Sequence, residues 1–378
     1  MRICVIAAGD RAGFPTGGTS SFLSALLPEL VKRHSVAFLG LDGLSSLSTS
    51  QTGDKSSHHT LRRVMRSIRL ASVAQLVRWN TQLRRWKPDV LYVHSPELAA
   101  GTRVIFPSLP TVLHLHGTEN PLRFSRFTWA RQCHRAYGGI YRFAIHGASL
   151  ILCSSSEEDR DLLCRSYRVD SPRVRFSPMM YDSSHFYPMP EPEENLKAQR
   201  FPRRFITASR LSSVKRLHLA IRAFSALYPK HRDTELWIAG DGENRHDLEN
   251  LASESPGAGA IRFLGDLDRR AVASMMRGAI ALLLPSISEG FPLGALESLA
   301  CGTPVICSPV GYLGSLVRHG RNGFHVDAES IESTVTAMES SLSCYPLLSP
   351  ACLESARLYS PTIVAPVIMA ALEEACRS

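Results

Sequence analysis

Short apolar segments alternate with amphipathic ones from residue 205 onward, and this alternation restricts the fold more than any other feature. Strands are predicted over 205–208, 235–239, 261–264 and 279–284. Helices are expected between them, over 217–227, 246–254 and 270–277. Strands that alternate with helices favour a parallel sheet covered on both faces. We therefore predict an α/β domain over 204–360.

The first half of the chain repeats this pattern more loosely, and a second α/β domain is predicted over 1–182. Its strands are expected over 3–6, 36–39, 90–94, 111–116 and 149–154. A helix with apolar periodicity is expected over 22–32, after Gly17 and Gly18. The Ser- and Thr-rich residues 44–60 are predicted to form a loop. Residues 183–203 are rich in Pro and charge, which indicates an interdomain linker.

Bulk composition excludes several classes of protein. A hydrophobic content of 44% in 378 residues suffices for two packed cores, so the chain is neither disordered nor fibrous. The nine cysteines lack C-x-x-C spacing, and we expect free thiols in a reducing cytoplasm. The first ten residues are typical of a strand rather than of a signal peptide. No apolar run is expected to reach the roughly 18–20 residues that a membrane span needs.

The net charge of +9 is concentrated in the first half. Residues 1–190 contain 24 Lys and Arg against 13 Asp and Glu, whereas residues 191–378 contain 19 against 21. This asymmetry suggests that the first half meets something anionic. Arg62, Arg66 and Arg69, and the Arg- and aromatic-rich residues 123–142, suit an anionic membrane surface. Solvated helix faces over core aromatics explain the same residues, and both interpretations stay open.

Two carboxylates eight residues apart mark the candidate site. Glu289 lies in a loop punctuated by Gly and Pro, directly after the apolar run 279–284. Glu297 is predicted one to two turns into the helix that follows. Strand, loop and helix in this order place the loop at the carboxyl edge of a parallel sheet, where ligands bind. The start of a helix there presents free N–H groups to an anion.

The flanks of this pair carry a family resemblance. Glu289 and Glu297 form an E-x7-E motif, and residues 300–305 read ACGTPV. The stretch resembles the family 4 (group 1) retaining glycosyltransferases. The resemblance implies the GT-B fold, in which two Rossmann-like parallel-sheet domains face a central cleft. It also implies transfer of a sugar from a nucleoside-diphosphate sugar to a hydroxyl acceptor, without a metal or another cofactor. The final helix, 361–378, would cross back to the first domain.

The resemblance assigns the donor residues. Arg210 and Lys215 lie in a segment similar to the family's GRLxxxKG and are expected to hold the diphosphate, although Ser209 and Arg216 depart from that pattern. Fixed cations there would stabilise the charge on the leaving group. Glu289 is expected to accept a hydrogen bond from the sugar, and Glu297 from the ribose. Further donor-binding residues are predicted at Gly17, Gly18, Gly242, Leu264, Gly290, Phe291, Pro292, Leu293 and Gly294.

On the acceptor side, His116 matches the family's HG position beside the sugar and is counted with the catalytic residues. His94 and Glu119 are weaker acceptor candidates. His114 and His116 alternate along one strand, a spacing that a metal could use. No third ligand stands at a telling distance in sequence, and no metal site is predicted. Met179 and Met180 replace the Asn and Gly usual in the family, which puts the conformation of that turn in doubt.

The chain is thus interpreted as a cytoplasmic glycosyltransferase, with the basic first domain able to contact the inner face of the cell membrane. Cell-surface polysaccharide or glycolipid assembly is the expected setting. Three alternatives stay open: an enzyme that decorates a small natural product, a sugar-nucleotide epimerase of the same fold, and a non-catalytic partner subunit. No nucleic-acid module is recognised in the sequence, so nucleic acid is not expected as a partner.

Overall fold

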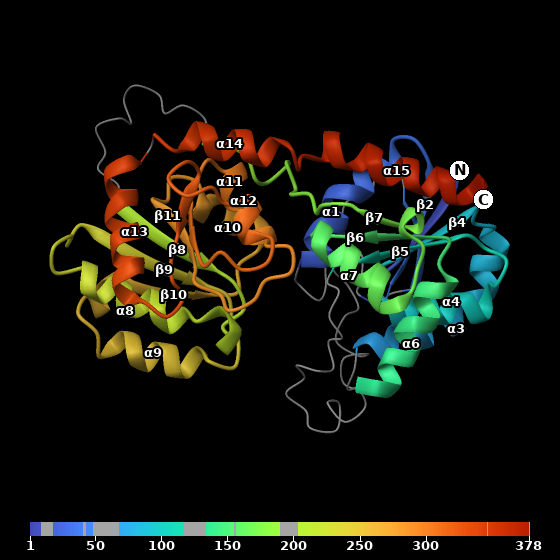
Figure 1. Ribbon diagram of the computed structural model, residues 1–378, viewed down its shortest axis with the longest axis horizontal. Coiled ribbons are helices and arrows are strands. Elements are labelled where there is room, and N and C mark those ends of the chain that lie inside the picture. Colours follow the sequence, from blue (N-terminus) through green and yellow to red (C-terminus); the bar gives the residue numbers. More distant parts are fainter. Residues whose placement is uncertain are drawn as a thin grey trace. The chain divides into compact units, whose positions relative to one another are not determined.

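The computed structural model describes residues 1–8, 18–40, 43–47, 68–116, 134–154, 156–189, 203–345 and 347–377. The chain forms two compact units (Figure 1). Unit 1 comprises Met1–Met180 and Pro361–Ser378, and unit 2 comprises Tyr181–Ser360. The predicted linker at 183–203 lies mostly outside the described residues. Its described part begins within unit 2, where Phe186 is buried.

Unit 1 is built on a seven-stranded sheet. Its order is β3-β2-β1-β4-β5-β6-β7, and every pair is parallel except β2 with β3. The apolar runs of the sequence become buried strands because helices pack against the sheet. The strands are β1 Arg2–Ile6, β2 Ser35–Gly40, β3 Gly43–Leu47, β4 Val90–Val93, β5 Thr111–Leu115, β6 Leu150–Cys153 and β7 Val174–Phe176.

The edge strand β3 corrects the prediction of a loop over 44–60. Residues 43–47 pair with β2 in an antiparallel hairpin, with Leu44 opposite Leu39. An edge strand is covered on fewer sides than a central one, so its sequence needs no continuous apolar run. Ser45 and Ser46 are therefore tolerated there, and they hid the strand from sequence reasoning. Residues 48–60 lie outside the described residues.

Two helices of unit 1 begin at serine caps. Ser95 accepts a hydrogen bond from Leu98 N, and Ser156 accepts one from Asp159 N. Glu157, Glu158 and Asp159 then meet the positive end of the helix dipole. The helices are α1 Gly18–Val31, α3 Ile68–Trp86, α4 Pro96–Ile105, α6 His134–Gly147, α7 Glu157–Tyr167 and α15 Pro361–Arg377.

The C-terminal helix α15 packs on unit 1, against α1, β4 and β5. Val364, Ile368 and Leu372 form its buried stripe. By length and composition alone, Ser349–Arg377 is apolar enough to cross a membrane, contrary to the expectation that no segment would be. The buried stripe favours a core helix of a globular unit instead, because such helices pass the same test.

Unit 2 contains a six-stranded sheet of order β10-β9-β8-β11-β12-β13, parallel throughout. Its strands are β8 Arg203–Ala208, β9 Thr234–Ala239, β10 Ile261–Gly265, β11 Ala281–Leu284, β12 Val305–Cys307 and β13 Gly323–His325. Its helices are α8 Leu217–Leu227, α9 Arg245–Ser253, α10 Arg269–Met276, α11 Leu293–Ala300, α12 Leu313–Leu316, α13 Ile331–Cys344 and α14 Ser349–Arg357. The alternation predicted from the sequence is confirmed.

The strand orders define one special place in each sheet. In unit 2 the chain builds outward from β8 through β9 to β10, then returns to the other side of β8 with β11. In unit 1 the corresponding reversal lies between β1 and β4. The loops that leave neighbouring strands at such a switch point diverge and open a crevice at the carboxyl edge of the sheet.

Candidate active site

The switch point of unit 2 brings Lys215 and Glu289 together. Lys215 ends the short 3₁₀ helix Ser213–Lys215 after β8, and Glu289 lies in the loop after β11. Lys215 Nζ lies 2.6 Å from Glu289 Oε1. Backbone bonding joins the two loops, since Ile287 N donates to Val214 O at 2.9 Å. Two residues 74 positions apart in sequence thus form a largely buried ion pair.

Glu289 is oriented by a second donor. Ser286 Oγ donates to the same Oε1 atom at 2.7 Å. Charge-assisted hydrogen bonds of this kind are short and strong, and two of them hold the carboxylate in one position. Among the described residues, Oε2 of Glu289 has no hydrogen bond, so this oxygen can accept one from a ligand hydroxyl.

Arg210 lies in the loop after β8 and forms a surface ion pair. Arg210 Nη2 contacts Glu243 Oε2 at 3.0 Å, and both side chains are exposed. Exposed pairs of this kind contribute little to stability, about 0–1 kcal/mol. The guanidinium can therefore leave Glu243 for an anionic ligand at small cost.

Close backbone packing fixes the loop that bears Arg210. Leu211 N donates to Asp241 O, and Asn244 N donates to Leu211 O, at 2.9 and 3.0 Å. A side chain at Gly242 would collide with the carbonyl of Leu211. Gly242 is thus needed because it leaves room for the neighbouring backbone. The sequence predicted Gly242 as a donor-binding residue and did not indicate this packing role. Leu264 lies nearby in the sheet, at the end of β10 next to β9.

The Glu289 loop is supported from β12 as well. Gly311 adopts a left-handed conformation with φ +52°, and an added Cβ would collide with the carbonyl of Glu289. Phe291 stacks on Tyr312 with ring centroids 4.9 Å apart. The predicted loop therefore contacts the segment that follows β12, through Phe291. It contains Gly290, Phe291 and Pro292 and lies directly before α11. Leu293 and Gly294 form the first turn of α11.

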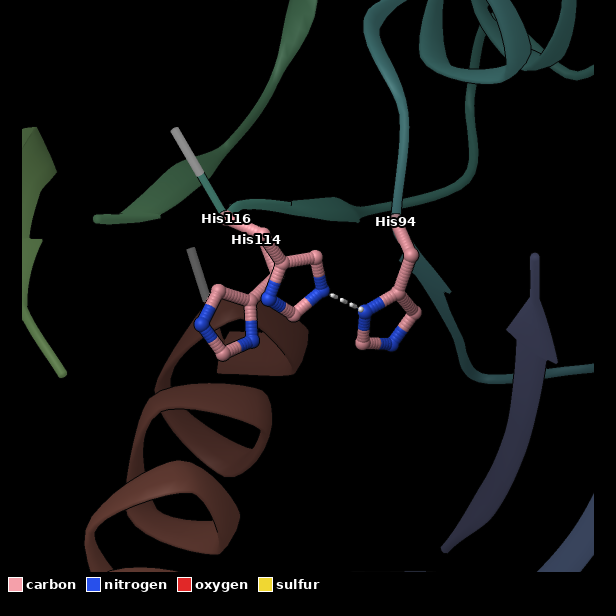
Figure 2. A group of neighbouring side chains, drawn as sticks. All are labelled: His94, His114 and His116. Atoms are coloured by element: carbon pink, nitrogen blue, oxygen red, sulfur yellow. Dashed lines mark hydrogen bonds between the residues drawn. The ribbon is translucent and has the colours of Figure 1, made fainter. Parts of the chain in front are cut away.

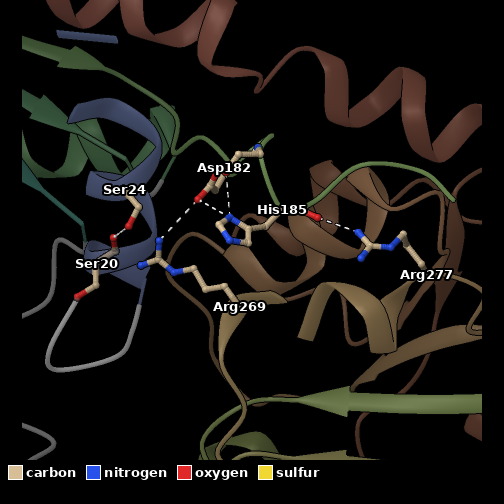
Figure 3. A network of polar contacts seen from close by, with 7 residues as sticks. Ser20, Ser24, Asp182, His185, Arg269 and Arg277 are labelled. Carbon is tan, nitrogen blue, oxygen red and sulfur yellow. Dashed lines mark hydrogen bonds and ion pairs between the residues drawn. The ribbon is translucent and has the colours of Figure 1, made fainter. Parts of the chain in front are cut away.

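Glu297 projects from the second turn of α11 and is buried. Burial raises the pKa of its carboxyl to about 8, an effect that Arg269 opposes and Asp182 reinforces. Arg269 itself contacts Asp182, with Nη1 and Oδ2 3.7 Å apart (Figure 3). His185 Nδ1 lies 3.1 Å from the same oxygen, and Arg277 donates to His185 O at 2.8 Å. Asp182 ends the segment in which Met179 and Met180 depart from the family pattern, but the sequence assigned it no role. Arg269 lies in no recognised motif.

The carboxyl edge of the sheet in unit 1 holds three histidines. His94 follows β4, His114 lies in β5 and His116 follows β5 (Figure 2). His94 Nδ1 and His116 Nε2 are 2.9 Å apart. Phe22 of α1 packs against all three rings. Burial lowers the pKa of His116 to about 4 and lowers the pKa values of His94 and His114 well below 6.5. The cluster is therefore neutral at physiological pH.

The proton positions in this cluster follow from its acceptors. His116 Nδ1 lies 3.1 Å from Met179 Sδ, and a thioether can only accept. This nitrogen therefore carries the proton, His116 Nε2 accepts, and His94 Nδ1 donates to it. His94 Nε2 is left with a lone pair, and this buried atom has no hydrogen-bond partner among the described residues. Such an atom can accept a hydrogen bond from a ligand hydroxyl.

His114 is held by both ring nitrogens. Ser154 Oγ donates to Ser177 O at 2.7 Å, so it accepts from His114 Nε2. His114 Nδ1 then accepts from the Tyr92 hydroxyl. The nitrogens of the three histidines are close enough to share a metal ion. Because hydrogen bonds already use both nitrogens of His114 and both nitrogens of His116, only His94 Nε2 could bind one as arranged. His114 is instead a hydrogen-bonded core residue, as its burial suggests.

Other predicted residues are less informative. Gly18 begins α1 at the switch point of unit 1, and nothing lies within 4 Å of a Cβ added there. Gly17 and Glu119 lie outside the described residues. Ser286, Gly311 and Tyr312 were missed in the sequence, although Gly311 and Tyr312 follow soon after the ACGTPV segment. Met179 and Met180 are buried, and Met179 contacts His116.

Comparisons with known proteins identify the family. Residues 191–354 match the family model described as "Glycosyl transferases group 1", and residues 16–184 match that described as "Glycosyltransferase Family 4". Glycogen synthase of Mycobacterium tuberculosis (strain H37Rv) is 29% identical over 266 residues, 68% of this chain and 61% of that protein. D-inositol 3-phosphate glycosyltransferase of Rhodococcus jostii (strain RHA1) is 30% identical over 201 residues, 51% of this chain and 44% of that protein. The matches thus span less than two thirds of these relatives.

Solved structures show the same architecture. HepE of Anabaena, in complex with UDP, superposes with a TM-score of 0.71 at 16% identity, covering 99% of this chain and 100% of that one. Sucrose-phosphate synthase of Thermosynechococcus elongatus superposes with a TM-score of 0.75 at 15% identity, covering 99% and 98%. At these identities the likeness shows the fold alone, and that fold is GT-B. The two family models together span most of the chain, which therefore belongs to the group 1 (family 4) glycosyltransferases.

Proposed function

We propose that the protein transfers a sugar from a nucleoside-diphosphate sugar to a hydroxyl acceptor, with retention at the anomeric carbon. The observation that carries the proposal is the pair of Lys215 Nζ and Glu289 Oε1, 2.6 Å apart at the switch point of unit 2. A sugar and its β-phosphate are covalent neighbours. A cation for the phosphate and a carboxylate for the sugar must therefore be neighbours too.

The donor would lie along the carboxyl edge of unit 2. Lys215 and Arg210 bind the diphosphate, and Glu289 Oε2 accepts a hydrogen bond from a sugar hydroxyl. Glu297, in the second turn of α11, accepts a hydrogen bond from a ribose hydroxyl. The positive end of α11 adds to the attraction for phosphate. Fixed cations at this point stabilise the leaving diphosphate more than the bound donor, which lowers the barrier.

The reaction needs no further reagent in this proposal. The acceptor oxygen forms a bond to the anomeric carbon as the bond from that carbon to the phosphate oxygen breaks. The bonding electrons stay on the phosphate oxygen, which takes the proton of the acceptor hydroxyl. Glu289 stabilises positive charge on the sugar ring during this step. Lys215 and Arg210 supply the charge that a metal would otherwise provide, so we propose a metal-independent enzyme without a cofactor.

Unit 1 would supply the acceptor side. The lone pair of His94 Nε2 can accept a hydrogen bond from a second, non-reacting hydroxyl of the acceptor, and His116 holds His94 in the required tautomer. A neutral His116 can also contact a sugar hydroxyl without repelling the positive charge that develops on the ring. His94 was predicted to bind the acceptor and His116 to be catalytic. We propose that the two act together, joined by their hydrogen bond.

The choice of donor and acceptor follows the relatives. HepE has been solved with UDP and with UDP-glucose, which supports a UDP-sugar as the first donor to test. The relatives include a glycogen synthase, and the neighbours include a lipopolysaccharide outer core galactosyltransferase. Both support an acceptor in polysaccharide or glycolipid assembly. The eight described cysteines are free, which suits the reducing cytoplasm that we propose as the location.

Activity measurements on paired variants test the proposal. Glu289→Gln and Lys215→Met should each lower kcat by at least about tenfold, since each removes charge that acts on the transition state. Glu339→Gln and Lys230→Met change the same charges in an exposed ion pair of unit 2 and serve as controls. NMR of the product should show the anomeric configuration of the donor. Unchanged kinetics in the first two variants, an inverted product, or an epimerised donor formed without acceptor would refute the proposal.

A further inference from the structure

Three helices of unit 1 form a surface that is both cationic and apolar. Helices α3, α4 and α6 lie side by side against the sheet (Figure 1). On this surface, here called the basic-apolar face, four large apolar side chains are exposed: Val77 by 56%, Val104 by 71%, Ile140 by 43% and Phe143 by 42%. Single exposed apolar residues are ordinary in proteins, but a group of them on adjacent helices indicates contact with a partner.

Two arginines connect these helices. Arg84 of α3 donates to Ile105 O at the end of α4 and lies over the Phe106 ring at 4.9 Å. Arg103 of α4 lies over the Phe143 ring of α6 at 4.7 Å and donates to Phe143 O. Val77 stands two helical turns before Arg84, on the same stripe of α3. Arg84 and Arg103 therefore link the outer surfaces of α3, α4 and α6, the helices on which the four apolar side chains are exposed.

The charge of this face has one sign. The 19 residues of α3 and the 14 residues of α6 include no Asp or Glu. Helix α4 has one carboxylate, Glu97, which accepts a hydrogen bond from the Tyr137 hydroxyl. Arg85 of α3 and Arg142 of α6 add exposed cations beside the face. The complementary partner is thus anionic.

We propose that the basic-apolar face docks on the surface of an anionic lipid bilayer. Lipid headgroups supply negative charge, and the boundary with the acyl chains accepts Val77, Val104, Ile140 and Phe143. A nucleic acid would satisfy the arginines but not the aliphatic side chains, which have no flat surface on which bases stack. The proposal does not rest on the glycosyltransferase activity, because the face lies outside the donor and histidine sites.

Binding of the full chain to vesicles tests the proposal. We expect binding to vesicles that contain phosphatidylglycerol and much weaker binding to phosphatidylcholine alone. Arg85→Gln with Arg142→Gln should weaken binding about 25-fold, since each cation near an anionic surface contributes about fivefold. Val77→Ser with Val104→Ser should abolish the binding that persists at high salt, where charge is screened. These substitutions change exposed side chains, so circular dichroism and Tm should be unchanged.

Matched controls come from unit 2. Arg222→Gln with Arg232→Gln removes two exposed cations, and Leu347→Ser removes an apolar side chain that is 79% exposed. Neither should change vesicle binding. The proposal is overturned if phosphatidylglycerol has no effect, or if the controls lose binding equally. It is also overturned if a labelled single-stranded DNA binds through the same arginines while vesicles do not. Sugar transfer to a soluble acceptor should be unaffected by any of these variants, which separates this test from that of the catalytic site.

Discussion

The buried carboxyl of Glu297 makes a quantitative prediction about donor binding. Its pKa is raised to about 8, with burial as the main cause. At pH 7 the carboxyl is then about nine-tenths protonated. A protonated carboxyl has one hydroxyl that must itself donate, whereas a carboxylate can accept from both ribose hydroxyls. We therefore expect donor binding to expel the proton from Glu297.

The magnitude follows from this pKa. Binding at pH 7 should release about 0.9 proton, and affinity should rise by up to about tenfold for each pH unit between 6 and 8. Above pH 8 the dependence should disappear, because Glu297 is already ionised in the free protein. Arg269 and Asp182, which face Glu297, act in opposite directions on this pKa and are parts of the same titration.

Isothermal calorimetry with UDP-glucose measures the proton release. The same titration is run at pH 7 in two buffers that differ in ionisation enthalpy, and the difference in heat gives the number of protons released. UDP-glucose suits this assay because its diphosphate is esterified at both ends and does not titrate in this pH range. Glu297→Gln should bind more weakly and release no proton. Heat that is independent of the buffer in the wild-type protein would refute the reasoning.

The same carboxyl affects the stability of the free protein. Between about pH 4.5 and 8 the folded state binds more protons at Glu297 than the unfolded state does, so the free energy of unfolding falls as pH rises. The full loss is about 5 kcal/mol above pH 8, from a shift of 3 to 4 pKa units. Glu297→Gln should therefore be more stable than the wild type at pH 8.5 and nearly equal at pH 5, as urea unfolding would show. An equal difference at both pH values would contradict this account.

Three further predictions concern single contacts. Gly311→Ala places a side chain against Glu289 O at positive φ and should destabilise unit 2 by more than about 1 kcal/mol in urea unfolding. The control Gly320→Ala has φ +73° but open space around the new Cβ, so it should cost only the backbone strain. Tyr92→Phe leaves the buried His114 Nδ1 without a hydrogen bond and should lower the free energy of unfolding by about 1–3 kcal/mol. Tyr141→Phe should leave it nearly unchanged, because the buried hydroxyl of Tyr141 has no partner among the described residues. Burial lowers the pKa of His116 to about 4, so the unfolded state binds more protons at this residue than the folded state does. The free energy of unfolding should therefore fall as the pH drops from 6.5 towards 4. An imidazole resonance of His116 that titrates near 6.5 in NMR would contradict this.

Much of the fold could be predicted from the alternation of apolar and amphipathic segments in the sequence. The alternation of buried strands with amphipathic helices predicted both parallel sheets, because a strand covered on two faces must be apolar throughout. β3 escaped this reasoning because an edge strand has no such requirement. The pair Lys215 and Glu289 was predicted from two separate motifs. Their contact at 2.6 Å was not, since sequence spacing does not show which loops meet at a sheet edge.

The residues that sequence reasoning missed act through other residues rather than on a ligand. Asp182 and Arg269 tune the pKa of Glu297, and Gly311 yields space to the backbone of Glu289. Each is separated in sequence from the group that it affects, and none belongs to a residue type with one characteristic role. Their importance is visible only once the fold brings them together. The motif residues identify the ligand chemistry, whereas these partners determine the protonation and position in which that chemistry operates.

The three histidines show how such partners change an interpretation. From the sequence, His116 was distinguished from His114 only by its match to the family's HG position. The hydrogen bonds separate them, because Tyr92 and Ser154 use both nitrogens of His114, while His116 transmits its tautomer to His94. Among the described residues, the one lone pair of this cluster without a partner is on His94 Nε2, a residue that the sequence marked only weakly. If this lone pair accepts a hydrogen bond from a non-reacting hydroxyl of the acceptor, His94→Phe should raise the acceptor KM far more than the donor KM. An equal rise in both would place His94 outside the acceptor site.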